Sequence, residues 1–104
     1  MAEMKVVNQL VAVETEADDD APYPLGRPTT FTWERPGGKR VYRVREILGS
    51  WATSRLWWTD NLPHDAPLDI WHYRLEAQSP QGSGVLVLTL DVARQEWRLT
   101  GFED

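Results

Sequence analysis

The feature that most constrains the fold is a series of short segments in which apolar and polar residues alternate. In Thr29–Arg35, Phe31 and Trp33 have one parity, while Thr30, Thr32 and Glu34 have the other. Leu68–Ala77 and Glu96–Phe102 alternate in the same way. A period of two residues is typical of a half-buried β-strand, because successive side chains in a strand point to opposite faces of the sheet. These segments therefore predict a sheet with one packed face.

Six strands are predicted, and the connections between most of them are short. They are expected at Val6–Val13, Thr29–Arg35, Val41–Leu48, Leu68–Ala77, Val85–Val92 and Glu96–Phe102. Pro36-Gly37-Gly38 and Ser79–Gly84 are typical of turns, and no amphipathic helix of useful length is evident. The expected fold is all-β: an antiparallel meander of about six strands that forms a strongly curved sheet or a small barrel.

Three places do not follow the simple pattern. Glu14–Arg27 combines five acids with two prolines and one glycine, so it is expected to be a mobile acidic loop. Gly49–Asp60 is compatible with a hairpin or a short helical turn, and its periodicity does not decide between them. In Val41–Leu48, a core-facing Tyr42, Val44 and Leu48 would place Glu46 inward, which indicates a bulge or a sheet edge there.

Size and composition exclude several classes of protein. The 104 residues predict a single β domain over 1–104, and the hydrophobic fraction of 41% is enough for a packed core. The absence of cysteine excludes disulfides, a thiol nucleophile and a cysteine zinc site. No apolar run is long enough for a membrane-spanning helix, and no signal peptide is evident, so a cytoplasmic location without a membrane partner is expected.

Positive charge is concentrated in one part of the chain. The net charge is −5, but residues 27–58 contain seven basic and two acidic residues and so carry +5. The remaining residues carry −10. Arg43 and Arg45 have the parity opposite to Tyr42 and Val44, so they are expected to project together into solvent. Such a separation of charge shapes the choice of partner more than the fold.

The basic segment is also rich in aromatic residues, which makes it the candidate binding surface. Cationic side chains neutralise phosphates and aromatic faces stack on unpaired bases, so the combination suits single-stranded nucleic acid or a kinked duplex. One of the adjacent Trp57 and Trp58 is a candidate exposed anchor. The alternative is that the aromatics are core residues and the arginines form a solvated face, paired with Glu34 and Glu46. The candidate contact residues are Lys39, Arg40, Arg43, Arg45, Arg55, Trp57 and Trp58.

No catalytic or metal-binding motif is evident, and neither a cofactor nor an enzymatic activity is expected. His64 and His72, with Asp60, Asp65 and Asp69, form the one cluster that resembles metal ligands, but their spacing matches no standard motif. The serines lack a G-x-S-x-G elbow, and no phosphate-binding glycine motif is present. A metal or small-ligand enzyme at the two histidines is therefore the weakest hypothesis.

Several segments together resemble a family of small bacterial proteins that has no established function. They are KRVYRVREILGSW, the pair Trp57-Trp58, DIWHYRLEAQ, GVLVLTLD and EWRLTGFED. The matching positions are Arg40, Tyr42, Arg43, Val44, Arg45, Trp51, Trp57, Trp58, Trp71, Arg74, Glu76 and Trp97. Members of this family are often encoded near a Y-family DNA polymerase, which implies an accessory role in the damage response. The acidic stretch from Glu14 departs from the family pattern.

The expected function is that of a non-enzymatic accessory binding module in translesion DNA synthesis. In this hypothesis the basic and aromatic hairpin contacts single-stranded DNA or a repair polymerase. The alternative is a protein–protein adaptor that makes no contact with nucleic acid. An exposed apolar patch beside the basic residues would favour the adaptor, whereas unpaired, solvent-facing arginines beside an exposed tryptophan would favour DNA.

Overall fold

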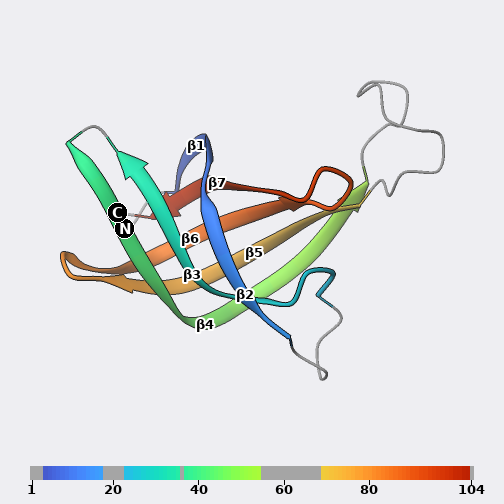
Figure 1. Ribbon diagram of the computed structural model, residues 1–104, viewed down its shortest axis with the longest axis horizontal. Helices are drawn as coiled ribbons and strands as arrows, with labels where there is room; N and C mark the ends of the chain where they lie inside the picture. Colours follow the sequence, from blue (N-terminus) through green and yellow to red (C-terminus); the bar gives the residue numbers. More distant parts are fainter. Residues whose placement is uncertain (1–3, 18–22, 36, 55–68, 104) are drawn as a thin grey trace.

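The computed structural model describes residues 4–17, 23–35, 37–54 and 69–103, which form one antiparallel sheet (Figure 1). The seven strands of the sheet lie in the order β1-β7-β6-β5-β4-β3-β2. Their bounds are β1 (Met4–Leu10), β2 (Ala12–Glu16), β3 (Arg27–Arg35), β4 (Gly38–Ser54), β5 (Asp69–Ser79), β6 (Gly82–Asp91) and β7 (Glu96–Glu103). The described residues contain no helix, and thus none that could span a membrane, so the expected all-β fold is confirmed.

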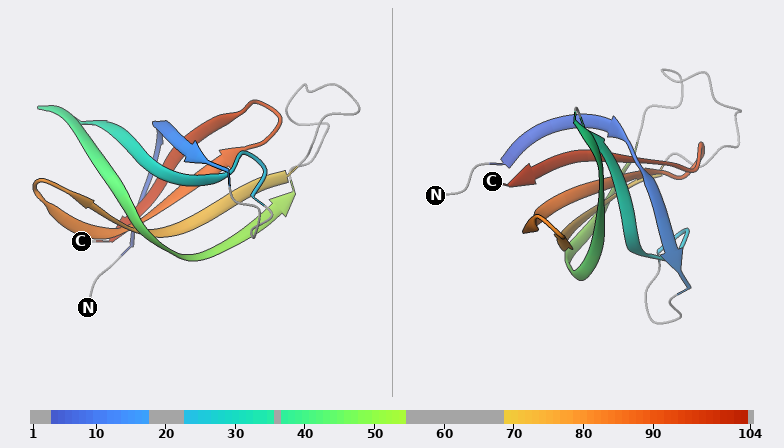
Figure 2. Two further views of the ribbon diagram at one scale, coloured as in Figure 1. Left: turned by 60° about the horizontal axis from the view of Figure 1, so that its bottom comes forward. Right: turned by 60° about the vertical axis from the view of Figure 1, so that its left-hand side comes forward.

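The first predicted strand is two strands, and together they supply both edges of the sheet. β1 pairs with β7 and β2 pairs with β3, while Val11 between them donates a backbone hydrogen bond to the Trp97 carbonyl at 3.1 Å. Because the two edges follow one another along the chain, the sheet curls into a half-barrel (Figure 2). The expectation of a strongly curved antiparallel sheet is therefore confirmed, with seven strands instead of about six.

The side chain of Gln9 joins β1 to β3 where the curled sheet meets itself. Its amide oxygen accepts a hydrogen bond from Trp33 Nε1 at 2.7 Å, and its amide nitrogen donates to the backbone carbonyl of Glu34. In the sheet order β1 is the first strand and β3 is the sixth of the seven, so the two are not neighbours within the sheet. One residue on the first strand thus satisfies the buried indole and holds the half-barrel closed.

The predicted acidic loop is shorter at both ends than 14–27. Glu14–Glu16 belongs to β2, and β3 begins at Arg27. These residues form strand pairs because β2 is an edge strand whose Glu14, Thr15 and Glu16 side chains are exposed, so their charge does not oppose pairing. The expected mobility concerns residues 18–22, which lie outside the described part of the chain.

β4 contains two bulges, and they change which of its residues face the core. The pairing with β5 shifts between Val44 and Glu46 and again between Ile47 and Gly49. The bulge expected near Glu46 is therefore confirmed, but the inward assignment of Leu48 is wrong: Ile47 lies opposite the buried Leu75, and Leu48 is 42% exposed. Of the undecided stretch, Gly49–Ser54 continues β4, and residues 55–60 lie outside the description.

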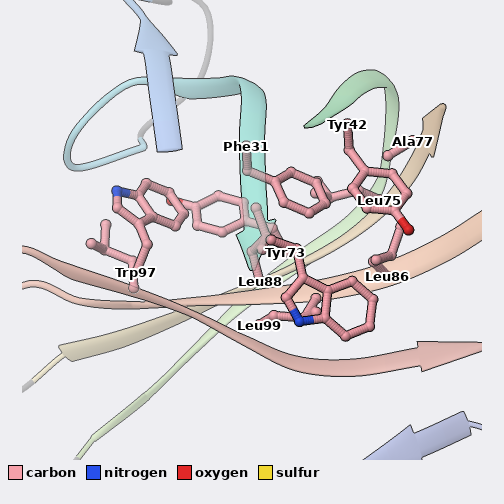
Figure 3. Close-up of a cluster of buried hydrophobic side chains, with 11 residues drawn as sticks. Phe31, Tyr42, Tyr73, Leu75, Ala77, Leu86, Leu88, Trp97 and Leu99 are labelled. Atoms are coloured by element: carbon pink, nitrogen blue, oxygen red, sulfur yellow. The ribbon is translucent and has the colours of Figure 1, made fainter. Parts of the chain in front are cut away.

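The core fills the concave side of the half-barrel (Figure 3). Its buried members are the inward residues of five strands: Phe31, Trp33, Tyr42, Tyr73, Leu75, Ala77, Leu86, Leu88, Leu90, Trp97 and Leu99. The parity predicted for Phe31, Trp33 and Tyr42 is thus correct. Phe31 and Tyr42 stack with ring centroids 5.0 Å apart, and Tyr73 packs against Trp97 at 5.4 Å.

The hydroxyl of Tyr73 is buried without a hydrogen-bond partner in the described structure. Burial, with a further contribution from Tyr23, raises the pKa of this phenol well above its usual range. Burying a hydroxyl without a hydrogen-bond partner lowers the free energy of unfolding by about 1–3 kcal/mol. We therefore expect Tyr73→Phe to raise the free energy of unfolding by about 1 kcal/mol, measured by urea denaturation.

Tyr42→Phe is the matched control for this prediction. The Tyr42 hydroxyl lies 3.5 Å from Arg40 Nη1 and accepts a hydrogen bond from it. Removing this hydroxyl also removes a bond, so no gain in stability is expected. A loss of stability in Tyr73→Phe as large as that in Tyr42→Phe would contradict the assignment of an unpaired hydroxyl.

Candidate binding surface on strand β4

The convex face of β4 carries a line of exposed side chains, which we call the outer stripe. Residues before the first bulge face outward when their parity is opposite to that of the buried Tyr42. At each bulge two consecutive residues of β4 lie opposite one residue of β5. As a result of the two bulges, Trp51 also faces outward, opposite His72. The exposed members of the outer stripe are Lys39, Val41, Arg43, Arg45, Glu46, Leu48 and Trp51.

The apolar members of the outer stripe are unusually exposed. Val41 is 51% exposed, Leu48 is 42% exposed and Trp51 is 45% exposed. Within the described residues, Leu10 is the one other large hydrophobic side chain that is exposed. Exposed apolar residues that lie along one strand indicate a contact surface more strongly than scattered ones do.

The basic members of the outer stripe keep their charge available. Arg45 Nη1 donates to Gln78 Oε1, an uncharged partner, at 2.8 Å. Neither Arg43 nor Arg45 forms an ion pair with a carboxylate in the described part of the chain. Of the alternative, the core position of an aromatic is confirmed for Tyr42. Ion pairs of Arg43 or Arg45 with Glu34 or Glu46 are not present among the described residues.

Lys39 does have a carboxylate partner, but the pair is weak. Its Nζ lies 3.5 Å from Glu34 Oε1, and the two side chains are 71% and 70% exposed. Ion pairs this exposed contribute less than about 1 kcal/mol. Near them the hairpin extends past its neighbours, because β2 stops pairing with β3 at Thr32 and β5 stops pairing with β4 at Arg43 (Figure 1).

Two glutamates divide the outer stripe into unlike halves. Glu46 lies directly opposite Glu76 on β5, so an acidic pair separates the arginines from Leu48 and Trp51. The half nearer the hairpin tip is basic, with Lys39, Arg43 and Arg45, and the other half is apolar. The positive charge of the outer stripe is therefore concentrated in the first half.

Trp51 is held in a defined position on the outer face by His72. The indole and imidazole rings stack with centroids 5.2 Å apart and an angle of 6° between the planes. Thr53 Oγ1 lies 2.9 Å from His72 Nε2, and Thr89 Oγ1 lies 3.4 Å from Nδ1. Burial lowers the pKa of His72, which favours the neutral ring. The stack covers one side of the indole and leaves a large part of Trp51 facing solvent.

The structure brings together some of the predicted site residues and separates others. Lys39, Arg43 and Arg45 share the outer face, whereas Arg40 lies opposite the buried Trp33 and faces the concave side. The sequence contains a signal for this, because Arg40 has the parity of Tyr42. Arg55, Trp57 and Trp58 lie outside the described residues. Val41 and Leu48 were missed, and Leu48 faces outward only because of the bulges.

The histidine cluster is not assembled in the part of the chain that the structure describes. Among these residues no group of three or more potential metal ligands is present. His64 lies outside them, and both ring nitrogens of His72 contact threonine hydroxyls. The expectation that the chain holds no metal stays a prediction.

Comparison with known proteins gives a family and no function. A protein-family model described as a domain of unknown function (DUF6504) matches residues 1–104. Neither the curated proteins nor the solved structures contain a match to the chain. The expected connection with a Y-family polymerase therefore stays a prediction.

Proposed function

The chain belongs to the DUF6504 family of domains of unknown function, and we propose that it is a non-enzymatic module whose outer stripe binds single-stranded DNA. The observation that carries this proposal is the exposure of Arg43 and Arg45, which have no carboxylate partner among the described residues, on the same face of β4 as an exposed indole. The family resemblance supports an accessory role beside a Y-family repair polymerase.

The chemistry of the stripe suits a flexible phosphate backbone. The two arginines can each neutralise a phosphate, and Trp51 offers a face on which an unpaired base stacks. Thr30 lies opposite Arg43 and Thr32 lies opposite Val41, so two hydroxyl groups lie on the same face beside the cations. Hydroxyl groups of this kind position phosphates without reading sequence. The proposal therefore predicts weak sequence preference.

Binding of fluorescein-labelled oligothymidine, followed by fluorescence anisotropy, tests the proposal. Three cations from Lys39, Arg43 and Arg45 predict a slope of log K against log salt of about −2, since each contact to a single strand contributes about −0.7. Raising KCl from about 50 to about 200 mM should therefore weaken binding roughly fifteen-fold. Absent binding, or a dissociation constant that does not change with salt, would contradict the proposal.

The second candidate is a protein–protein adaptor, and the exposure of Val41 and Leu48 favours it. Aliphatic side chains do not stack on bases, but they are buried readily in a protein interface. If the adaptor is correct, a purified Y-family polymerase binds the wild-type chain, and Leu48→Asp weakens that binding at least about tenfold. The same variant should weaken binding of oligothymidine less than about threefold, because Arg43, Arg45 and Trp51 are all retained.

A further inference from the structure

A hollow of about 170 Å³ opens on the concave side of the sheet, on the face of β4 opposite to the outer stripe. It lies between the β3–β4 hairpin, the β5–β6 turn and the end of β7. Three aromatic side chains form part of its wall: Trp33 lies 6.3 Å from Tyr42 and 5.4 Å from Phe102, measured between ring centroids. The hollow thus has a rigid, largely apolar side.

Arg40 is the basic residue that lines this hollow. It is half-buried, and its Nη1 donates a hydrogen bond of 3.5 Å to the Tyr42 hydroxyl. Glu103 also lines the hollow, but its Oε1 is held by Arg74 Nη2 at 3.0 Å. The described residues place no carboxylate within ion-pair distance of Arg40, so its guanidinium is available to an anion at the edge of the aromatic wall.

The opposite rim of the hollow is a turn with a fixed shape. Ser79 Oγ accepts a hydrogen bond from the Gln81 amide at 3.3 Å and donates one to the Gly82 carbonyl at 3.2 Å. Gly82 has a φ of 142°, a value that residues with a Cβ rarely adopt. The rim therefore holds the exposed Gln81 and Ser83 side chains at the mouth of the hollow.

We propose that this hollow binds an oxyanion, a phosphate monoester or a carboxylate, with the Arg40 guanidinium as its main ligand. The planar guanidinium can donate two parallel hydrogen bonds to such a group, and the Tyr42 hydroxyl beside it is a further donor. The volume is below the roughly 300 Å³ of the smallest pockets for drug-sized ligands, so it suits an anionic head group and not a whole nucleotide. This site is separate from the outer stripe.

Two-dimensional NMR of the ¹⁵N-labelled chain, titrated with inorganic phosphate and separately with acetate, tests the proposal. At ionic strength balanced with KCl, one of the anions should cause saturable shifts of the Arg40 Nε–H signal and of the backbone amides from 81 to 84. The anion with the lower dissociation constant identifies the head group as phosphate or carboxylate. Shifts that never saturate, or that KCl reproduces, would overturn the assignment.

Three variants make the result specific to Arg40. Arg40→Gln should weaken anion binding at least about tenfold, and Arg40→Lys should weaken it less, because a point charge replaces the guanidinium fork. Arg43→Gln is the control on the same strand and the opposite face, and it should bind the anion as the wild type does. Undiminished anion binding by both Arg40 variants would overturn the proposal. Loss of DNA binding in Arg43→Gln alone would concern the outer stripe and not the hollow.

Discussion

Reversing two charges, in the Arg43→Glu/Arg45→Glu variant, is expected to abolish binding of single-stranded DNA, with a loss of affinity of at least about 100-fold. Each hydrogen bond to a charged group contributes about 1.5–3 kcal/mol, and about 1.4 kcal/mol is a factor of ten in affinity. Two lost contacts therefore account for about two orders of magnitude. The new carboxylates would also stand beside Glu46 and Glu76, which makes that part of the stripe repel phosphates.

The variant should fold, because both arginines are exposed and the substitution removes an exposed hydrogen bond, from Arg45 to Gln78. Circular dichroism and the thermal midpoint check this directly. Arg94→Glu changes the net charge by −2, as Arg43→Glu alone does, and is the charge control for that single variant, since Arg94 is exposed in the turn before β7 and away from β4. It should change the affinity less than about threefold. Equal losses of affinity in Arg94→Glu and Arg43→Glu would show a response to total charge and would contradict the outer stripe as the DNA-binding surface.

Phe31→Ala is expected to lower the free energy of unfolding by about 3–5 kcal/mol, because a large buried ring is replaced by a cavity. Phe31 is 1% exposed, stacks on Tyr42 and lies on β3 between β2 and β4. The total free energy of unfolding of a domain of this size is about 5–15 kcal/mol. The substitution therefore removes a large share of the stability, and a urea denaturation curve measures it.

Val41→Ala provides the comparison on the outer face. Val41 is 51% exposed and belongs to the same hairpin. Its truncation to alanine should therefore lower the free energy of unfolding by less than about 1 kcal/mol. If Phe31→Ala cost no more than Val41→Ala, the packed side of the β3–β4 hairpin would have been assigned to the wrong face. The pair of variants thus tests the face assignment on which the outer stripe depends.

Much of the sheet was predictable from local patterns. The alternation around Phe31 and Trp33, and that around Tyr73 and Leu75, indicates both the strands and their buried faces. This works because the period of a strand is set by backbone geometry and acts over a few residues. Glu46 at an inward position was also a usable signal, since a charge where the core is expected indicates a change of parity.

Other features of the candidate site were not predictable from the same patterns. Leu48 faces outward because of a bulge in the pairing of β4 with β5. The sequence of β4 does not reveal this bulge, because apolar residues occur at both parities in this part of the strand. The bend at Val11 depends on β1 pairing with β7 and β2 pairing with β3. The hollow at Arg40 depends on the β5–β6 turn and the end of β7 meeting the hairpin.

The amino-acid sequence by itself determined the strands, their turns and the concentration of cations on one hairpin, because these follow from neighbours along the chain. The tertiary structure decided which face each cation occupies and which apolar residues stay exposed. Strand register, bulges and the curl of the sheet arise from pairing between residues far apart in the sequence. Arg43 and Arg45 are thereby placed on one surface of the molecule and Arg40 on the other.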